Sequence, residues 1–171
     1  MGWDRGIDYE YAYNVLVRSL KTRNNRARVR KCYSAILLIQ LRNGLRISEA
    51  IRAFKQFMTT RKAELSVNVS KKKKPEARLV VIPIEVVETQ LDECVELVSI
   101  DDNVLKNRIC AYAIQVFKFN THSLRYAFIT RLLKEGVSPS IISKITRHSK
   151  LDFILTYTQE RVAEEVLKKL D

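Results

Sequence analysis

The chain has 171 residues, enough for one hydrophobic core, so we expect a single domain. Hydrophobic residues make up 46% and charged residues 29%, a balance that excludes an intrinsically disordered chain. The 31 Lys and Arg against 19 Asp and Glu give a net charge of +12, which predicts an anionic partner, nucleic acid first. No apolar run reaches the roughly 20 residues of a bilayer span, and no signal peptide is visible.

Helices are predicted throughout the first third of the chain. Asp8 is a helix cap, followed by an apolar face of Ala12, Val15, Leu16 and Leu20. The basic segment 21–31 is a connection, either solvated or in contact with phosphates. Residues 33–44 form a buried helix that ends at Asn43-Gly44, and the helix 45–57 follows with Arg46 at its N-terminal edge.

A β-hairpin comes next. Residues 64–70 alternate apolar and polar side chains, and a second apolar strand covers 78–83, with four lysines between them. Pro83 then opens a helix. The apolar stripe expected on this helix is Ile84, Val87, Leu91, Cys94 and Val98.

The rest of the chain is again helical. Asp101 or Asp102 caps a helix that extends to about Val116, and the helix 122–135 ends at Gly136. Ser138-Pro139 starts the helix 140–148, whose inward residues are expected to be Ile141, Ile142 and Ile145. A last helix, 157–171, carries an apolar stripe of Val162, Val166, Leu167 and Leu170.

The cysteines indicate a reduced, intracellular protein. Cys32, Cys94 and Cys110 are far apart in the sequence and form no C-x-x-C pair. We therefore expect neither a zinc site nor a disulfide framework.

Four stretches follow one another in a set order: GLRISEA, the lysine-bearing hairpin, THSLRYAF and RHSKLDFILTYT. This ordered set resembles the catalytic domain of the tyrosine recombinases, the phage-type integrases. The resemblance covers the chain from residue 8 to its C-terminus. It implies a mainly α (α+β) fold, helical with one small antiparallel β-hairpin or sheet.

The resemblance also implies the catalytic positions, which are Arg46, a hairpin lysine, His122, Arg125, His148 and Tyr157. His148 and Tyr157 are 157 − 148 = 9 positions apart, the usual spacing in the family. The spacing back from Arg78 selects Lys73 as the lysine, which we prefer, whereas the end of the first strand selects Lys71. We interpret Glu49 as holding local geometry.

The chemistry of strand cleavage suits these residue types. Two guanidiniums, Arg46 and Arg125, would clamp the non-bridging oxygens of a phosphodiester with forked hydrogen bonds. Tyr157 would attack phosphorus to give a covalent 3′-phosphotyrosine, with His122 handling its proton. His148 would hydrogen-bond the scissile phosphate, and the lysine would protonate the leaving oxygen. The phosphotyrosine conserves the bond energy, so we expect no metal and no other cofactor.

The family pattern sets further expectations for the whole chain. Family members commonly have Gly where this chain has Arg147, which puts the turn before His148 in doubt. Residues 1–171 would be one catalytic domain of a longer integrase, without the N-terminal core-binding domain. The expected partners are double-stranded DNA and further copies of the chain, assembled as a tetramer on DNA, with no membrane. The tail 158–171 would dock on a neighbouring copy or fold back on its own core.

Two other functions remain open. A type IB topoisomerase-like enzyme would nick and religate DNA by the same chemistry without a defined site. A non-catalytic DNA-binding protein on the same fold would insert the helix that ends at His148 into a groove. An RNA-binding module is disfavoured because the chain lacks an aromatic RNP-type strand pattern.

Overall fold

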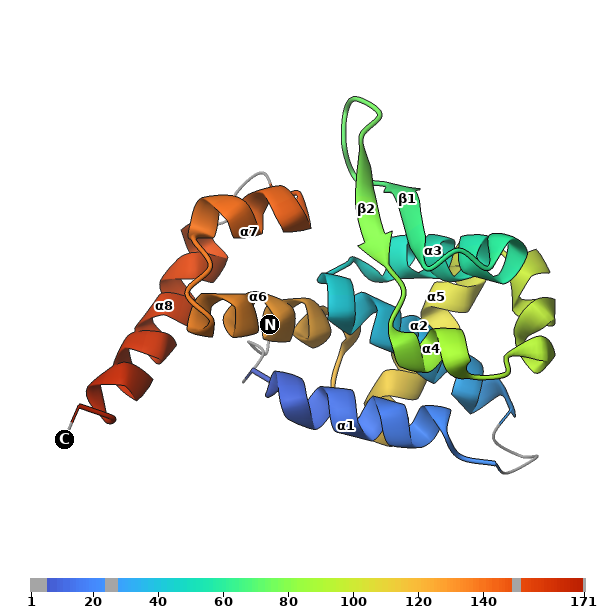
Figure 1. The fold of residues 1–171 in the computed structure, drawn as a ribbon, viewed down its shortest axis with the longest axis horizontal. Coiled ribbons are helices and arrows are strands. Elements are labelled where there is room, and N and C mark those ends of the chain that lie inside the picture. The colour runs from blue at the N-terminus through green and yellow to red at the C-terminus, as the bar shows by residue number, and fades with distance from the viewer. Residues whose placement is uncertain (1–5, 24–27, 149–151, 171) are drawn as a thin grey trace.

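Helices make up most of the structure, a computed structural model that describes residues 6–23, 28–148 and 152–170, except the side chains at 153–155, 157, 158 and 161. The mainly helical prediction with one two-stranded antiparallel sheet is confirmed (Figure 1). None of the helices in these ranges is long and apolar enough to cross a membrane. The elements are α1 (Tyr9–Leu20), α2 (Arg28–Asn43), α3 (Ile47–Thr60), β1 (Glu64–Asn68), β2 (Ala77–Val81), α4 (Ile84–Glu88), η2 (Asp92–Ser99), α5 (Asp102–Tyr112), η3 (Ala113–Phe117), α6 (Thr121–Lys134), α7 (Pro139–Thr146) and α8 (Asp152–Leu167).

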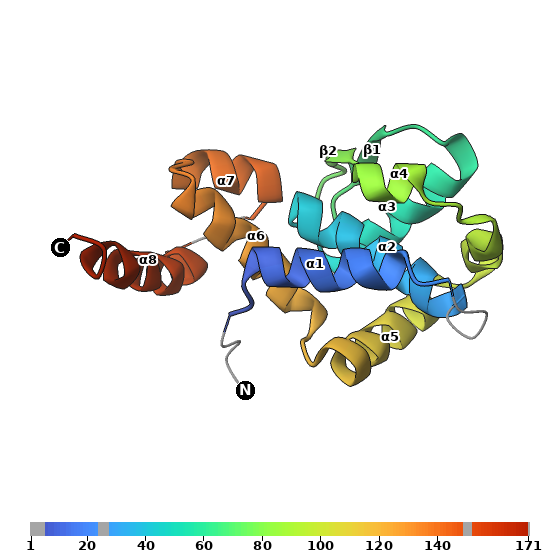
Figure 2. The same ribbon diagram turned by 60° about the horizontal axis from the view of Figure 1, so that its bottom comes forward.

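Helix α2 is the centre of the core. It is buried almost continuously from Cys32 to Leu41, and it contacts α1, α3, α5 and α6 (Figure 2). An apolar run without helical periodicity is what a helix covered on all sides requires. The predicted connection before it is shorter than expected, because residues 28–31 already belong to α2. Residues 24–27 of that connection lie outside the described ranges.

The predicted helix ends are confirmed where the sequence carries a capping signal. The Asp8 carboxylate accepts a hydrogen bond from the Tyr11 amide at 2.9 Å, and Asp101 accepts from the Asn103 amide at 2.9 Å. Gly44 and Gly136 follow α2 and α6 with φ of +61° and +81°. These left-handed conformations cost glycine little and other residues more, so both positions stop their helices.

The β-hairpin rises from the helical body (Figure 1) and pairs Leu65 with Val80 and Val67 with Arg78. Its inward face is apolar except for Arg78, which is buried. The Asn43 side chain fixes the hairpin to the end of α2. Its amide nitrogen donates to the Val81 carbonyl at 2.8 Å, and its oxygen accepts from the Val81 amide at 2.9 Å. The hairpin therefore has a defined position over the start of α3.

The continuous helix predicted after Pro83 is wrong. The chain forms the short helix α4 and then a 3-10 helix, η2, with Thr89 in an extended conformation between them. The expected stripe is only partly correct, because Leu91 and Cys94 are buried whereas Ile84 and Val87 are exposed. The break lets buried residues of both pieces face α2 and α3, which one straight helix of this length would not allow.

Helix α6 connects the core to α7 and α8, which lie at one end of the molecule (Figure 1). In α7, Ile142 is buried as predicted, but Ile141 and Ile145 are exposed, so the prediction is wrong for these two. Because α7 packs on one neighbouring helix, a narrower face of α7 is buried than the sequence pattern indicated. The last helix, α8, begins at Asp152, earlier than the predicted start at 157.

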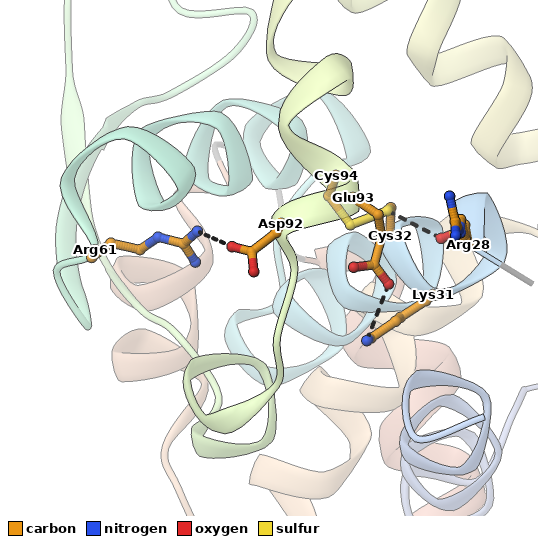
Figure 3. Close-up of a disulfide and its surroundings, with 7 residues drawn as sticks. All are labelled: Arg28, Lys31, Cys32, Arg61, Asp92, Glu93 and Cys94. Atoms are coloured by element: carbon orange, nitrogen blue, oxygen red, sulfur yellow. Dashed lines mark hydrogen bonds and ion pairs between the residues drawn. A yellow bond between two sulfur atoms is a disulfide. The ribbon is translucent and has the colours of Figure 1, made fainter. Parts of the chain in front are cut away.

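The expectation of reduced cysteines is wrong for Cys32 and Cys94, which form a disulfide (Figure 3). Both residues are buried, and they are 62 positions apart. They meet because η2 packs on the first turns of α2, where Lys31 also pairs with Glu93 at 3.2 Å. The pairing depends on this tertiary contact, so no spacing in the sequence could indicate it. Cys110 is a free thiol.

Reducing the Cys32–Cys94 bond should lower the free energy of unfolding by about 2–4 kcal/mol, because the cross-link restricts the unfolded chain over a long loop. Urea unfolding followed by circular dichroism, with and without a phosphine reductant, measures the difference. A Cys110→Ala variant should keep the full response, and a Cys32→Ala/Cys94→Ala variant should lose it. A thiol titration first shows that the bond is open. An unchanged urea midpoint of the reduced protein would then contradict the stabilising role of the disulfide.

Candidate active site

The turn that precedes Arg46 depends on Gly44. This residue has φ +61°, and a Cβ there would lie 2.3 Å from Cδ1 of Phe128 on α6. Both the conformation and the packing therefore require glycine. The Gly44 carbonyl accepts a hydrogen bond from Nη1 of Arg125 at 2.9 Å. The turn thus brings the start of α3 and the middle of α6 together.

Glu49 holds the start of α3 and the hairpin in one place. It lies in the first turn of α3 and its side chain is 0% exposed. The carboxylate accepts hydrogen bonds from the amides of Arg46 at 3.1 Å and Ser70 at 3.0 Å, and it pairs with Nη1 of Arg46 at 3.1 Å. Arg46 also caps α3, as its predicted position at the helix edge requires. These contacts agree with the interpretation of Glu49 as a residue that holds local geometry.

Two further guanidiniums approach the same carboxylate. Nη1 of Arg78 lies 3.8 Å and Nη1 of Arg125 3.9 Å from Oε2 of Glu49. Burial lowers the pKa of both arginines to about 10, and the negative charge of Glu49 opposes this lowering. Both arginines therefore remain charged at neutral pH. Three positive groups thus surround one negative group, and the cluster has an excess of positive charge.

Arg125 is held by carbonyls and by His148. It is 2% exposed, and besides the Gly44 carbonyl it donates from Nη2 to the Thr146 carbonyl at 2.8 Å. Its Nε lies 3.2 Å from Nε2 of His148. Burial and then the charge of Arg125 lower the pKa of His148 to about 3, so this imidazole is neutral at pH 7. The structure therefore brings two of the predicted residues, from α6 and from the end of α7, into direct contact.

His122 lies at the first turn of α6, and its side chain is exposed. The surrounding protein nevertheless removes part of the water around its ring, and this desolvation is the largest cause of a lowered pKa. The positive charges of Arg125 and Lys71 lower the pKa of His122 further, because a second proton on the ring would be repelled by these basic residues.

The four hairpin lysines are all exposed. Lys71 acts electrostatically on His122, and Lys72 acts on His148 while pairing with Glu76 at 3.5 Å. For Lys73, no hydrogen bond or ion pair is found within the described part of the chain. Lys71 directly follows Ser70, whose backbone contacts Arg46 and Glu49, so it is placed next to the predicted site by the chain itself.

Tyr157 falls in α8, but its side chain lies outside the described residues. Its position relative to the arginines therefore stays a prediction. Arg46, Arg125 and His148 are brought together, with His122 and Lys71 close enough to act on one another electrostatically.

Arg147 resolves the doubt about the turn before His148. It has φ +57°, a left-handed conformation in which glycine is favoured, so the chain keeps this turn at a modest conformational cost. Nη1 of Arg147 pairs with Glu76 of the hairpin at 3.1 Å. The arginine thus connects the end of α7 to the hairpin, which a glycine would not do.

Sequence analysis missed the two arginines that support the hairpin. Arg78 donates from Nη2 to the Asn43 carbonyl at 2.6 Å, and its Nε and Nη1 have no hydrogen-bond partner among the described residues. Arg52 donates from Nη2 to the Asn68 carbonyl at 2.8 Å and to the Ser70 hydroxyl at 2.6 Å. No local signal marked Arg78 as buried, because the apolar residues that follow it do not alternate and its inward position is set by the pairing of β2 with β1.

The fold is similar to one already known from a solved structure. The structure is similar to the crystal structure of XerA recombinase, with a TM-score of 0.59 and 14% identity, over 100% of this chain and 65% of that one. The sequence matches the phage integrase family over residues 12–164, and the chain belongs to this family.

Relatives in the family come from viruses and an archaeon. The chain is 43% identical over 169 residues to a protein named as an integrase from Acidianus two-tailed virus, covering 98% of this chain and 68% of the relative. It is 32% identical over 197 residues to an uncharacterised protein of Methanocaldococcus jannaschii, covering 98% and 88%. An integrase-named protein of Sputnik virophage is 28% identical over 203 residues, covering 98% and 90%. The resemblance found in the sequence is thus confirmed at the level of the family.

Replacing Glu49 by Gln should lower the free energy of unfolding by about 3–5 kcal/mol, because it leaves buried cations without their counter-charge. Urea unfolding with and without added phosphate measures this. Phosphate should stabilise Glu49→Gln more than the parent, because the ion can replace part of the lost negative charge. The matched control is Glu64→Gln on the exposed side of β1, which should change stability little. Equal stability of Glu49→Gln and the parent at all phosphate concentrations would refute the role of the carboxylate.

Proposed function

We propose that this chain is a site-specific DNA recombinase that joins mobile or viral DNA to a host genome through a covalent 3′-phosphotyrosine. The observation that carries the proposal is the cluster in which the guanidiniums of Arg46, Arg78 and Arg125 share the single buried carboxylate of Glu49. A phosphodiester group placed there would meet an excess of positive charge that is already oriented. Membership of the phage integrase family supports the same reaction class.

In the proposed reaction, the phenolic oxygen of Tyr157 forms a bond to phosphorus while the bond from phosphorus to the 5′ oxygen breaks. His122 accepts the phenolic proton, and the hairpin lysine gives a proton to the departing 5′ oxygen. Arg46 and Arg125 bind the non-bridging oxygens, where negative charge increases in the transition state. Rejoining is the reverse sequence with the 5′ hydroxyl of another strand as the nucleophile.

Assembly on DNA is a further part of the proposal. Double-stranded DNA is the partner, and the active assembly is a tetramer in which the tail 158–171 contacts a neighbouring copy. The apolar residues of the tail are exposed in the single chain, which supports this role. Leu167 is 71% exposed and Leu170 is 73% exposed. The contact between Lys134 of α6 and Glu165 of α8, at 3.0 Å, orients the helix without covering these leucines.

A nicked suicide substrate, which loses its leaving strand after cleavage, should trap a covalent protein–DNA adduct on a denaturing gel. Tyr157→Phe should abolish the adduct, because phenylalanine has no nucleophilic oxygen. Tyr11→Phe, on the exposed face of α1, is the matched control and should form it normally. An adduct that persists in Tyr157→Phe would refute the assignment, and a parent protein that binds DNA without any adduct would favour the non-catalytic alternative. Relaxation of supercoils without a preferred site would favour the topoisomerase-like alternative.

For the leaving oxygen, we favour Lys71 as the proton donor over Lys73, because Lys71 directly follows Ser70, whose backbone contacts Glu49 and Arg46. Lys71→Ala should slow cleavage by about 10²–10⁴-fold, the usual contribution of a general acid, and Lys73→Ala should slow it much less. A substrate with a 5′ sulfur at the cleaved bond tests the role directly, because a thiolate leaves without a proton. The sulfur should restore the rate of Lys71→Ala. Restoration of Lys73→Ala instead would transfer the role to that residue.

A further inference from the structure

Thr146 makes two contacts that leave its hydroxyl no freedom. It is the last residue of α7 and is 0% exposed. Its Oγ1 lies 2.8 Å from the Ile142 carbonyl oxygen and 2.8 Å from Nδ1 of His148. A hydroxyl has one proton, so Oγ1 can donate to only one of these groups and must accept from the other if both contacts are hydrogen bonds.

Arg125 and Thr146 together select one of the two arrangements. Its Nε lies 3.2 Å from Nε2 of His148, and its Nη2 lies 3.1 Å from each ring nitrogen. Arginine has only donors, so both ring nitrogens face guanidinium protons, and the one ring proton belongs on the nitrogen that has another acceptor, which is Nδ1 beside Thr146. A neutral imidazole then carries its proton on Nδ1. That proton goes to Oγ1 of Thr146, and the hydroxyl proton goes to the Ile142 carbonyl.

The surroundings keep the ring neutral. Burial is the largest cause of the lowered pKa of His148, and the groups whose charges lower it further are Arg125 on α6, Arg46 at the start of α3, Arg78 on β2 and Lys72 in the hairpin loop. A second proton on the ring is therefore disfavoured in the DNA-free protein, and the tautomer described above is the one that gives every proton an acceptor.

We propose that Thr146 is a positioning residue that fixes His148 as the Nδ1–H tautomer, with the Nε2 lone pair directed at Arg125. Its meaning for catalysis rests on the proposed function. In this state His148 holds Arg125 in place but has no proton on Nε2 to give to a phosphate oxygen. When a phosphate enters and takes over the Arg125 donors, its negative charge favours uptake of a proton from solvent at Nε2. His148 would then become the phosphate donor that the family pattern implies.

Nitrogen-15 NMR of the DNA-free protein tests the tautomer without any need for activity. The chain has only two histidines, so a His122→Gln variant identifies the His148 signals. The parent and Thr146→Ser, which keeps the hydroxyl, should both show a protonated Nδ1 and an unprotonated Nε2. Thr146→Val, which keeps the shape but removes the hydroxyl, should show a mixture of tautomers. A protonated Nε2 in the parent, or a pure Nδ1–H form in Thr146→Val, would overturn the proposal.

Cleavage of the suicide substrate supplies the second readout. Thr146→Val should slow adduct formation by about 10–100-fold, the scale expected when a reacting group is slightly misplaced, while the salt dependence of DNA binding stays the same. Thr146→Ser should restore most of the rate, and thermal unfolding checks that both variants fold. Equal rates for the Val variant and the parent would remove the catalytic part of the proposal. If the parent forms no adduct, the proposed function fails while the NMR result for the tautomer still stands.

Discussion

The buried carboxylate of Glu49 is the interaction on which the rest of this site depends. It bonds to the backbone at the start of α3 and at Ser70 in the loop after β1, and guanidiniums from the N-cap of α3, from β2 and from α6 converge on it. Without a counter-charge these buried cations would repel one another and incur a large desolvation cost. One carboxylate is enough to assemble them but too little to neutralise them, so the protein keeps a net positive, preorganised site.

Carbonyl oxygens complete the positioning of the arginines. Arg78 donates to the carbonyl of Asn43, and Arg125 donates to the carbonyls of Gly44 and Thr146. Neutral acceptors fix the direction of a guanidinium without cancelling its charge. The turn at residues 43–44 therefore has two roles, since it ends α2 and also supplies acceptors to two arginines from distant parts of the sequence. Glycine is required at position 44 because its φ is positive and a Cβ there would meet Phe128.

Local signals in the sequence predicted the helix ends, the hairpin and the order of the basic residues, because capping, alternation and motif spacing act over a few residues. Features set by tertiary packing were not predictable. The Cys32–Cys94 pairing joins segments 62 positions apart, and the outward direction of Ile141 and Ile145 follows from how little of α7 is covered. Arg78 was the instructive case, because a charged residue in a strand suggests solvent whereas a buried carboxylate from another element holds it inside.

The ion pair between Arg147 and Glu76 makes the connection between the end of α7 and the hairpin sensitive to ionic strength. Its side chains are 37% and 32% exposed, so dissolved salt weakens it. This pair joins the loop that carries the lysines to the turn that carries His148. Under the proposed function, added salt will weaken DNA attachment through the phosphates and, separately, loosen the link between the hairpin loop and the turn at His148. Turnover under the proposed function, measured on DNA that is already bound, will depend on salt for this internal reason.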